Sequence, residues 1–500
     1  MTPKLLRTAS LPALALAVAF GAHASAQAAP PTAEQAKALE AEVRNALATL
    51  VGGSVDLPSR PVELTPEGDH YRVRVPLGVL GRIEPTDAAV TMRARMVDGG
   101  RWSLEDEQFP PRLQVTASVD VPDPAGAGDG PSGGSHKEMQ SYGISVGRQD
   151  VHGLFDPTFA TPTTSEGTIT SIDVARVGGS LPSRSHFGRV VTQASIRPNN
   201  PERIDVLSDA STEDYVTENA LPDGTAFKMT AQVVRAVSSL AGVAHAQLLP
   251  LLHSAIEATR LQSRPGVPAD ADAEKAALRR TLVAANAALT GGRIEETASG
   301  VTFDYGGHAG SLAKLAMAFG GTSPEDMLTT TMGFTLDGLV IDELPPQLAA
   351  YVPTHFTMRP IVSNVSVKDL TRMAMDATQP GDGKVSPQDM QAAFSHGGIN
   401  FSFDPVELDI AGTQFAGAGR FTMTGPQAIT GEAEITAHDL DGLIAKAQAN
   451  PLLARGVPAI IFLKGIAHTA GDQAVWQVSV ANDKVLVNGM DLGAMAGALQ

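Results

Sequence analysis

Two serines carry the spacing of known nucleophile motifs. Ser145 lies in Gly-Ile-Ser-Val-Gly, which matches the G-x-S-x-G pattern of hydrolases, and Ser311 precedes Lys314 with the S-x-x-K spacing. The first motif needs a strand that turns sharply into a helix, whereas the residues around Ser145 continue as a strand. The second places its lysine one helical turn after the serine, but the accompanying S-D-N and K-T-G motifs are missing. We therefore predict no catalytic residue.

The loop 378–389, TQPGDGKVSPQD, resembles the second half of an EF-hand loop. Oxygen ligands for calcium would come from Thr378, Asp382, Ser386 and Asp389. Pro380 occupies an early ligand position, and the closing Asp389 is shorter than the usual glutamate. Calcium takes six to eight oxygen ligands, more than these side chains supply. A helix–turn–helix loop explains the pattern equally well, so we predict no metal site and keep the four residues as calcium candidates.

Other cofactor and metal chemistries have no pattern in the sequence. The G-x-G-x-x-G run at 128–133 lies in a Gly/Pro/Asp loop, without the strand and helix that dinucleotide binding needs. The histidines are scattered, and His245 and His253 stand eight residues apart. The chain has no cysteine, which excludes disulfides, thiolate metal sites and a cysteine nucleophile. We expect no cofactor.

The N-terminus has the three parts of a secretory signal peptide. Lys4 and Arg7 precede the apolar run 11–20, and Ala-x-Ala triplets end at Ala26 and Ala28. A membrane-spanning helix needs roughly 20 apolar residues, about twice the length of this run. We therefore expect cleavage near Ala26 or Ala28 and export to the periplasm.

The rest of the chain argues against membrane spans and nucleic-acid binding. The later apolar segment 457–463 is short and contains Pro458, so we expect no transmembrane span after cleavage. The formal net charge is −17, and no basic run with interleaved aromatic residues offsets it. Such an acidic surface repels phosphate backbones, so we expect no nucleic-acid partner.

The elements begin with a helix and continue as strands. Thr32 and Gln35 form a capping box, followed by apolar residues at helical spacing until Gly52-Gly53. Beyond residue 55 the period of alternation becomes two, which is typical of half-buried antiparallel strands. The clearest examples are Tyr71, Val73, Val75; Leu113, Val115, Ala117; Val406, Leu408, Ile410; and Ala433, Ile435, Ala437.

Two helical patterns interrupt the strands in the middle of the chain. The first comprises Val233, Val237, Leu240 and Ala244, and the second Leu278, Leu282, Ala285 and Leu289. Pro265 and Pro268 separate them, and Gly291-Gly292 ends the second. This arrangement predicts a helical hairpin inserted between two β-rich halves.

Two later segments resemble each other. Each runs from a strand end, at Val365 or Ile435, into a helix whose start carries an aspartate, Asp369 or Asp439. An aspartate there can cap free N–H groups and stabilise the helix dipole. We interpret the pair as a repeated strand-to-helix unit.

Three C-terminal segments, 421–425 (FTMTG), 431–443 (GEAEITAHDLDGL) and 484–489 (KVLVNG), resemble alphaproteobacterial exported proteins with a domain of unknown function 2125. That group is distantly similar to AsmA-like and YdgA-like envelope proteins. The resemblance covers about the last 200 residues and implies a long curved antiparallel sheet with helices on one side, in the periplasm. It carries no catalytic residue over. Because we expect the N-terminal segment to be cleaved, we expect no lasting N-terminal anchor of the kind that AsmA-type proteins have.

The sequence therefore predicts a β-rich α+β fold, a long curved antiparallel sheet with an inserted helical hairpin and short packing helices. Its regions are 1–28 (signal peptide), 29–225 (helix and β-meander), 226–292 (helical hairpin) and 293–500 (β-rich with short helices). We expect a non-enzymatic periplasmic envelope protein that binds lipid or another apolar envelope component on the sheet. The alternatives are a secreted hydrolase whose site, around Ser145 or Ser311, is assembled from distant residues, and a calcium-stabilised binding module.

Overall fold

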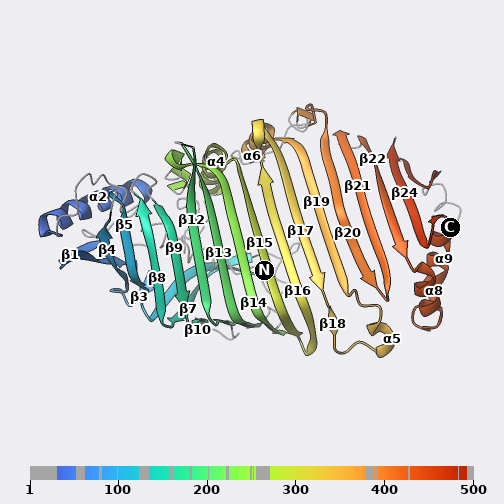
Figure 1. Cartoon of the computed structure of the whole chain (residues 1–500), viewed down its shortest axis with the longest axis horizontal. Helices are drawn as coiled ribbons and strands as arrows, with labels where there is room; N and C mark the ends of the chain where they lie inside the picture. The colour runs from blue at the N-terminus through green and yellow to red at the C-terminus, as the bar shows by residue number, and fades with distance from the viewer. Residues whose placement is uncertain are drawn as a thin grey trace. The chain divides into compact units, whose positions relative to one another are not determined.

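Figure 1 shows the computed structural model of the protein. It describes residues 31–51, 62–77, 82–97, 100–122, 135–156, 161–178, 183–200, 202–220, 224–247, 250–251, 253–254, 271–377, 388, 391–392, 394–425, 428–481 and 484–491. The predicted signal peptide, 1–28, lies outside these residues.

Of the described residues, 63% lie in strands and 21% in helices, and these strands form a long antiparallel sheet that is not closed. Among the described residues, neighbouring strands pair in antiparallel orientation, as β15 and β16 do. This confirms the predicted fold class. The chain divides into two compact units, which are residues 1–228 with 233–289 and residues 229–232 with 290–500.

The first unit is an antiparallel sheet accompanied by α2 (Ala33–Val51) and α4 (Ala271–Ala288). Several of its strands pair out of chain order, so the sheet is not the simple meander that the sequence predicts. Its strands are β1 (Glu63–Glu67), β2 (His70–Pro76), β3 (Arg82–Glu84), β4 (Ala89–Met96), β5 (Trp102–Gln108), β6 (Arg112–Pro122), β7 (Ser135–Val146), β8 (Gln149–Asp156), β9 (Thr161–Ile169), β10 (Ile172–Val177), β11 (Ser183–Phe187), β12 (Val190–Asn200), β13 (Arg203–Ala220) and β14 (Ala226–Ala244). Residues 229–232 of β14 belong to the second unit.

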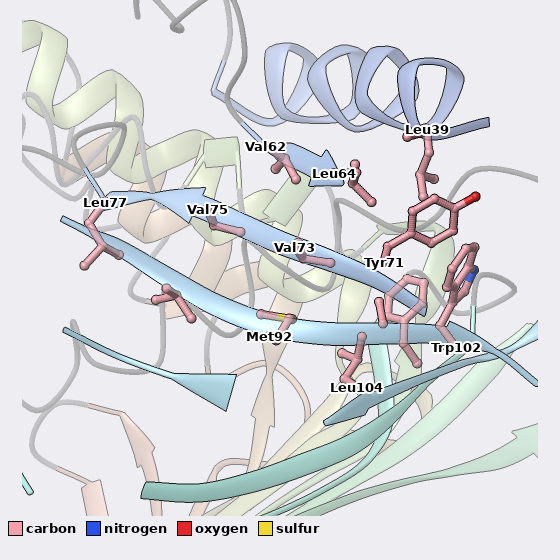
Figure 2. Packing of buried hydrophobic residues seen from close by; sticks show 14 of the residues in the cluster. Leu39, Val62, Leu64, Tyr71, Val73, Val75, Leu77, Met92, Trp102 and Leu104 are labelled. Atoms are coloured by element: carbon pink, nitrogen blue, oxygen red, sulfur yellow. The ribbon is translucent and has the colours of Figure 1, made fainter. Parts of the chain in front are cut away.

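The core of the first unit forms where α2 lies on the first strands. Leu39 of α2 points toward Leu64 and Tyr71, and Val73 and Val75 follow along β2 (Figure 2). The alternation of Tyr71, Val73 and Val75 therefore marks a buried face, as predicted. The helix start is also as predicted, because Thr32 and Gln35 exchange two backbone–side-chain hydrogen bonds of 3.2 Å each.

The prediction of a helical hairpin is wrong for the first of its two helices and correct for the second. The segment with Val233, Val237, Leu240 and Ala244 forms strand β14, and only the second predicted helix exists, as α4. β14 is rich in valine, whose branched side chain favours strands.

The second unit contains β15 (Gly291–Tyr305), β16 (His308–Thr322), β17 (Met327–Asp337), β18 (Val340–Ile341), β19 (His355–Ser366), β20 (Ile399–Ile410), β21 (Thr413–Gly425), β22 (Ala428–His438), β23 (His468–Ala470), β24 (Gln473–Ala481), β25 (Lys484–Val487) and β26 (Met490–Asp491). Its described α-helices are α5 (Pro346–Ala349), α6 (Val367–Ala377), α8 (Leu440–Gln448) and α9 (Val457–Gly465). The strands pair in the order β15–β16–β17–β19–β20–β21–β22–β24–β25.

The two predicted strand-to-helix units both exist, as β19–α6 and β22–α8. Asp439 caps α8, since its carboxylate accepts a 3.1 Å hydrogen bond from the backbone N–H of Gly442. In α6 the cap is Ser366, whose hydroxyl accepts from the N–H of Asp369 at 3.1 Å. Asp369 instead lies in the first turn and contacts Arg372 and His396. Both segments therefore run from a strand into a helix, but different residues cap the two helices.

In the first unit, the carboxyl group of Glu107 is buried, and its burial lowers the stability of the fold when the group is ionised. The pairing of β4 with β5 shifts register between Thr91 and Arg93, opposite Asp106 and Glu107, and Asp106 has a positive φ of 51°. Asp106 contacts Arg93, whereas burial raises the pKa of Glu107 to about 6. Ionised Glu107 therefore destabilises the fold at neutral pH.

The substitution Glu107→Gln should stabilise the protein above pH 6. A pKa raised from 4.5 to about 6 corresponds to about 2 kcal/mol, an upper limit because part of the residue still reaches water. The gain should be complete near pH 8, shrink as the pH falls through 6, and vanish below 4.5, where both states of the wild type are protonated. Urea denaturation across this pH range measures it, with Glu84→Gln, at an exposed position, as the control. An equal gain at pH 4 and pH 8 would contradict the assignment.

Candidate ligand-binding face

The second unit has a sheet with one apolar face. Residues directly opposite each other on neighbouring antiparallel strands point to the same face, and residues alternate between faces along a strand. Three rows follow from the strand register and define what we call the apolar face. They are Ile294–Phe319–Met332 across β15–β17; Met317–Phe334–Met358–Val406 across β16–β20; and Leu315–Leu336–Phe356–Leu408–Phe415–Ala437 across β16–β22.

The apolar face is covered at its C-terminal end. There Phe415, Ala437 and Trp476 belong to a cluster with Leu443 of α8 and Val457 of α9. The indole N–H of Trp476 donates a 2.8 Å hydrogen bond to the carbonyl of Leu463 and so fixes α9 to β24. Helices over this end bury apolar area, which stabilises the fold by roughly 25 cal/mol per Å².

The same face is open over β15, β16, β17 and β19, which lie side by side in Figure 1. Ile294, Met317, Phe319, Met332 and Met358 are each between 38% and 54% exposed. Single exposed apolar residues are ordinary, but a contiguous set marks a binding surface. Three of the five are methionines, whose flexible thioether side chains adapt to ligands of different shape.

Aromatic rings line the inner rows of the apolar face. The ring centroids of Phe334 and Phe356 are 5.9 Å apart, and those of Phe403 and Phe421 are 6.1 Å apart. Gly419 permits this packing, because a Cβ atom there would lie 2.7 Å from the Phe403 ring. Glycine thus lets a ring lie flat on the neighbouring strand.

The opposite face of the same strands is polar. One row runs from Lys314 through Asp337, His355 and Asp409 to Gln414. Beside it, the hydroxyls of Thr335 and Thr357 are 3.0 Å apart. Glu407 and Asp409 of β20 lie on this face, so the predicted alternation of Val406, Leu408 and Ile410 separates apolar from polar side chains.

His355 is the centre of an ion-pair group on the polar face. Its Nδ1 lies 2.6 Å from Asp337 Oδ1, and its Nε2 lies 3.5 Å from Glu407 Oε2. The Asp337 carboxylate raises the pKa of His355 above its ordinary value of 6.5, with a smaller contribution from Glu407. Protonation of His355 therefore strengthens the contact between β17, β19 and β20 at acidic pH.

We expect Asp337→Asn to lower the pKa of His355, measured by NMR titration of the imidazole. The raised pKa stabilises the fold below pH 6.5, and this stabilisation is lost as the pH rises through the folded-state pKa. The variant should therefore lose more stability at pH 5.5 than at pH 8.5. Thr335→Ala, two residues away on the same strand and face, is the control. An unchanged His355 titration in the asparagine variant would refute the pairing.

Ser145 lies in a row of residues across neighbouring strands that also contains an aspartate and a histidine, but their order does not suit a catalytic triad. It lies on β7 between Arg112 of β6 and Asp173 of β10, and His186 of β11 follows on the far side of Asp173. His186 Nδ1 is 2.7 Å from Asp173 Oδ1. Activation of a serine needs the imidazole next to the hydroxyl. Here the carboxylate separates them, with His186 two strand spacings from Ser145, about 10 Å.

Ser311 lies in strand β16, opposite Thr302 and Val340. The S-x-x-K spacing assumes a helix, in which residues three apart share a face. In a strand, residues three apart point to opposite faces, so Lys314 faces away from Ser311. His308, which contacts Glu343, is also three residues away and faces away from Ser311 for the same reason.

The calcium candidates Thr378, Asp382, Ser386 and Asp389 lie outside the described residues. Within the described residues, no group of three or more His, Asp or Glu side chains could hold a metal ion. No helix in the described part of the chain is long and apolar enough to cross a membrane.

The comparisons with known proteins gave no match. No family model matches the chain, and no curated protein or solved structure matches it. The resemblance to exported proteins with the domain of unknown function 2125 therefore stays a prediction.

Sequence reasoning missed the open part of the apolar face, although a signal was present. In β16, Leu315, Met317 and Phe319 alternate with Ala316, Ala318 and Gly320. The second set is small rather than polar, so the contrast between faces is weak within β16 alone. It becomes clear only when the register adds Ile294, Met332 and Met358 from the neighbouring strands.

Proposed function

We propose that this protein is a non-enzymatic envelope protein of the periplasm that binds the acyl chain of a lipid on its apolar face. The observation that carries the proposal is the open set Ile294, Met317, Phe319, Met332 and Met358 on a sheet whose other face is polar. Export rests on the N-terminal sequence pattern.

The chemistry of the face favours an acyl chain over a polar ligand. At their open end the defining rows contain aliphatic, methionine and phenylalanine side chains, and the only charged residue directly opposite a member of these rows is Glu296 of β15, which faces Met317 at the edge of the set. The five neighbouring strands β15, β16, β17, β19 and β20 span about 19 Å at roughly 4.8 Å per spacing. One bilayer leaflet is about 15 Å of hydrocarbon, so an acyl chain fits along the row.

The proposal predicts that open-face substitutions weaken binding of a monomeric fluorescent fatty acid. Burying one large apolar side chain against a ligand contributes about 1.5–3 kcal/mol, so Phe319→Ser and Met332→Ser should each raise Kd about 10-fold or more. The titration is done below the critical micelle concentration, without vesicles. Leu278→Ser, at a similarly exposed position on α4, is the control and should leave Kd unchanged.

Both open-face variants should keep the wild-type melting temperature, because the substituted side chains are half exposed. Equal Kd values for the wild type, Phe319→Ser and Met332→Ser would refute binding at this face. Native mass spectrometry of the protein purified after export gives an independent measurement, and co-purified lipid is the expected result.

A further inference from the structure

Helix α9 differs from the helix packed beside it. On α8 the buried positions are Leu443, Ile444 and Ala447, and the exposed ones include Asp441 and Lys446. This is the ordinary pattern of an amphipathic helix.

α9 is apolar on both sides. Val457 is buried and Ile460 packs partly on the same cluster, but the outward positions are Ile461, Phe462 and Leu463. Leu452, in the turn before α9, is also exposed. These four exposed side chains, which we call the α9 patch, are 40% to 62% exposed.

The α9 patch is held firmly in this exposed position. Trp476 binds the Leu463 carbonyl, and the side-chain amide of Asn488 donates to the Ile466 carbonyl at 2.6 Å. Lys464 contacts Asp441 of α8, which ties the two helices together. Asn450 accepts a 3.0 Å hydrogen bond from the N–H of Leu452 and donates to the Gln347 carbonyl at 2.8 Å. Burial of the patch therefore requires another molecule.

The segment that carries the patch is basic, whereas the chain as a whole is acidic. Residues 450–471 contain Arg455 and Lys464 and no aspartate or glutamate, and the net charge of the whole chain is −17. Lys464 is paired with Asp441 of α8, so Arg455 is the residue whose charge is available to a ligand. Basic residues beside exposed apolar side chains are typical of segments that lie in the interface of an anionic membrane.

We propose that the α9 patch inserts into the surface of an anionic lipid membrane. Leu452, Ile461, Phe462 and Leu463 would enter the boundary between headgroups and acyl chains, and Arg455 would face the lipid phosphates. This inference deepens the proposed function, since α9 covers the end of the apolar face whose open part would hold an acyl chain. Its test does not depend on that binding.

The absence of cysteine allows a single fluorescent label to report insertion. Phe462→Cys and Leu452→Cys, each labelled with an environment-sensitive dye in the full-length protein purified after export, are mixed with vesicles. One vesicle preparation is phosphatidylcholine with phosphatidylglycerol at about 3:1, and the other is phosphatidylcholine alone. Both labels should shift to the blue and brighten severalfold on the anionic vesicles, and less on the neutral ones. A label on Leu278→Cys of α4 should not respond.

The double substitution Phe462→Asp with Leu463→Asp should lower vesicle binding in flotation at least 10-fold, with an unchanged melting temperature. Phe319→Ser should bind vesicles like the wild type, which separates this inference from acyl-chain binding at the open face. Identical spectra of both labels with and without vesicles would overturn the proposal. So would a blue shift that depends on protein concentration alone, since that result indicates self-association. Equal responses to anionic and neutral vesicles would overturn the selectivity for anionic lipid.

Discussion

The second unit depends on one constraint: an amphipathic sheet must have its apolar face covered, and an open sheet covers only what its own helices reach. β-Strands alternate their side chains between two faces, so a long meander with consistent register collects all its apolar residues on one side. In this unit α8 and α9 bury that side around Trp476 and Ala437, while Met317, Phe319 and Met332 remain open. A closed barrel or a second sheet would remove the open part.

The open part is unfavourable for an isolated chain and therefore points to a ligand. Exposed apolar area of this kind promotes association unless something else covers it. The opposite face is dense with charges and hydroxyls, such as Asp337, His355 and Glu407, and keeps that side in water. An acyl chain meets the requirement of the apolar face without needing a polar partner there. The proposed function follows from this difference between the two faces rather than from any reactive group.

The sequence predicted the elements with strong local signals. The capping box at Thr32 and Gln35, the alternation at Tyr71, Val73 and Val75, and the strand-to-helix units at Asp369 and Asp439 are all present. β14 was predicted wrongly because Val233, Val237, Leu240 and Ala244 recur every three or four residues, which also fits a helix. Periodicity over so few positions does not separate the two, and pairing with distant strands then decides.

The candidate site was harder to predict than the fold, for a physical reason. The alternation of residues along a strand shows which side of the strand is apolar, but not whether another layer covers that side. Leu408 and Met358 both lie on the apolar side of their strands, and only Met358 lies in the open part. Chemical motifs depend in the same way on the element that carries them. S-x-x-K brings Ser311 and Lys314 together on a helix and separates them on β16. The proposed binding face therefore depends on the register between strands, which makes Ile294, Phe319 and Met332 neighbours.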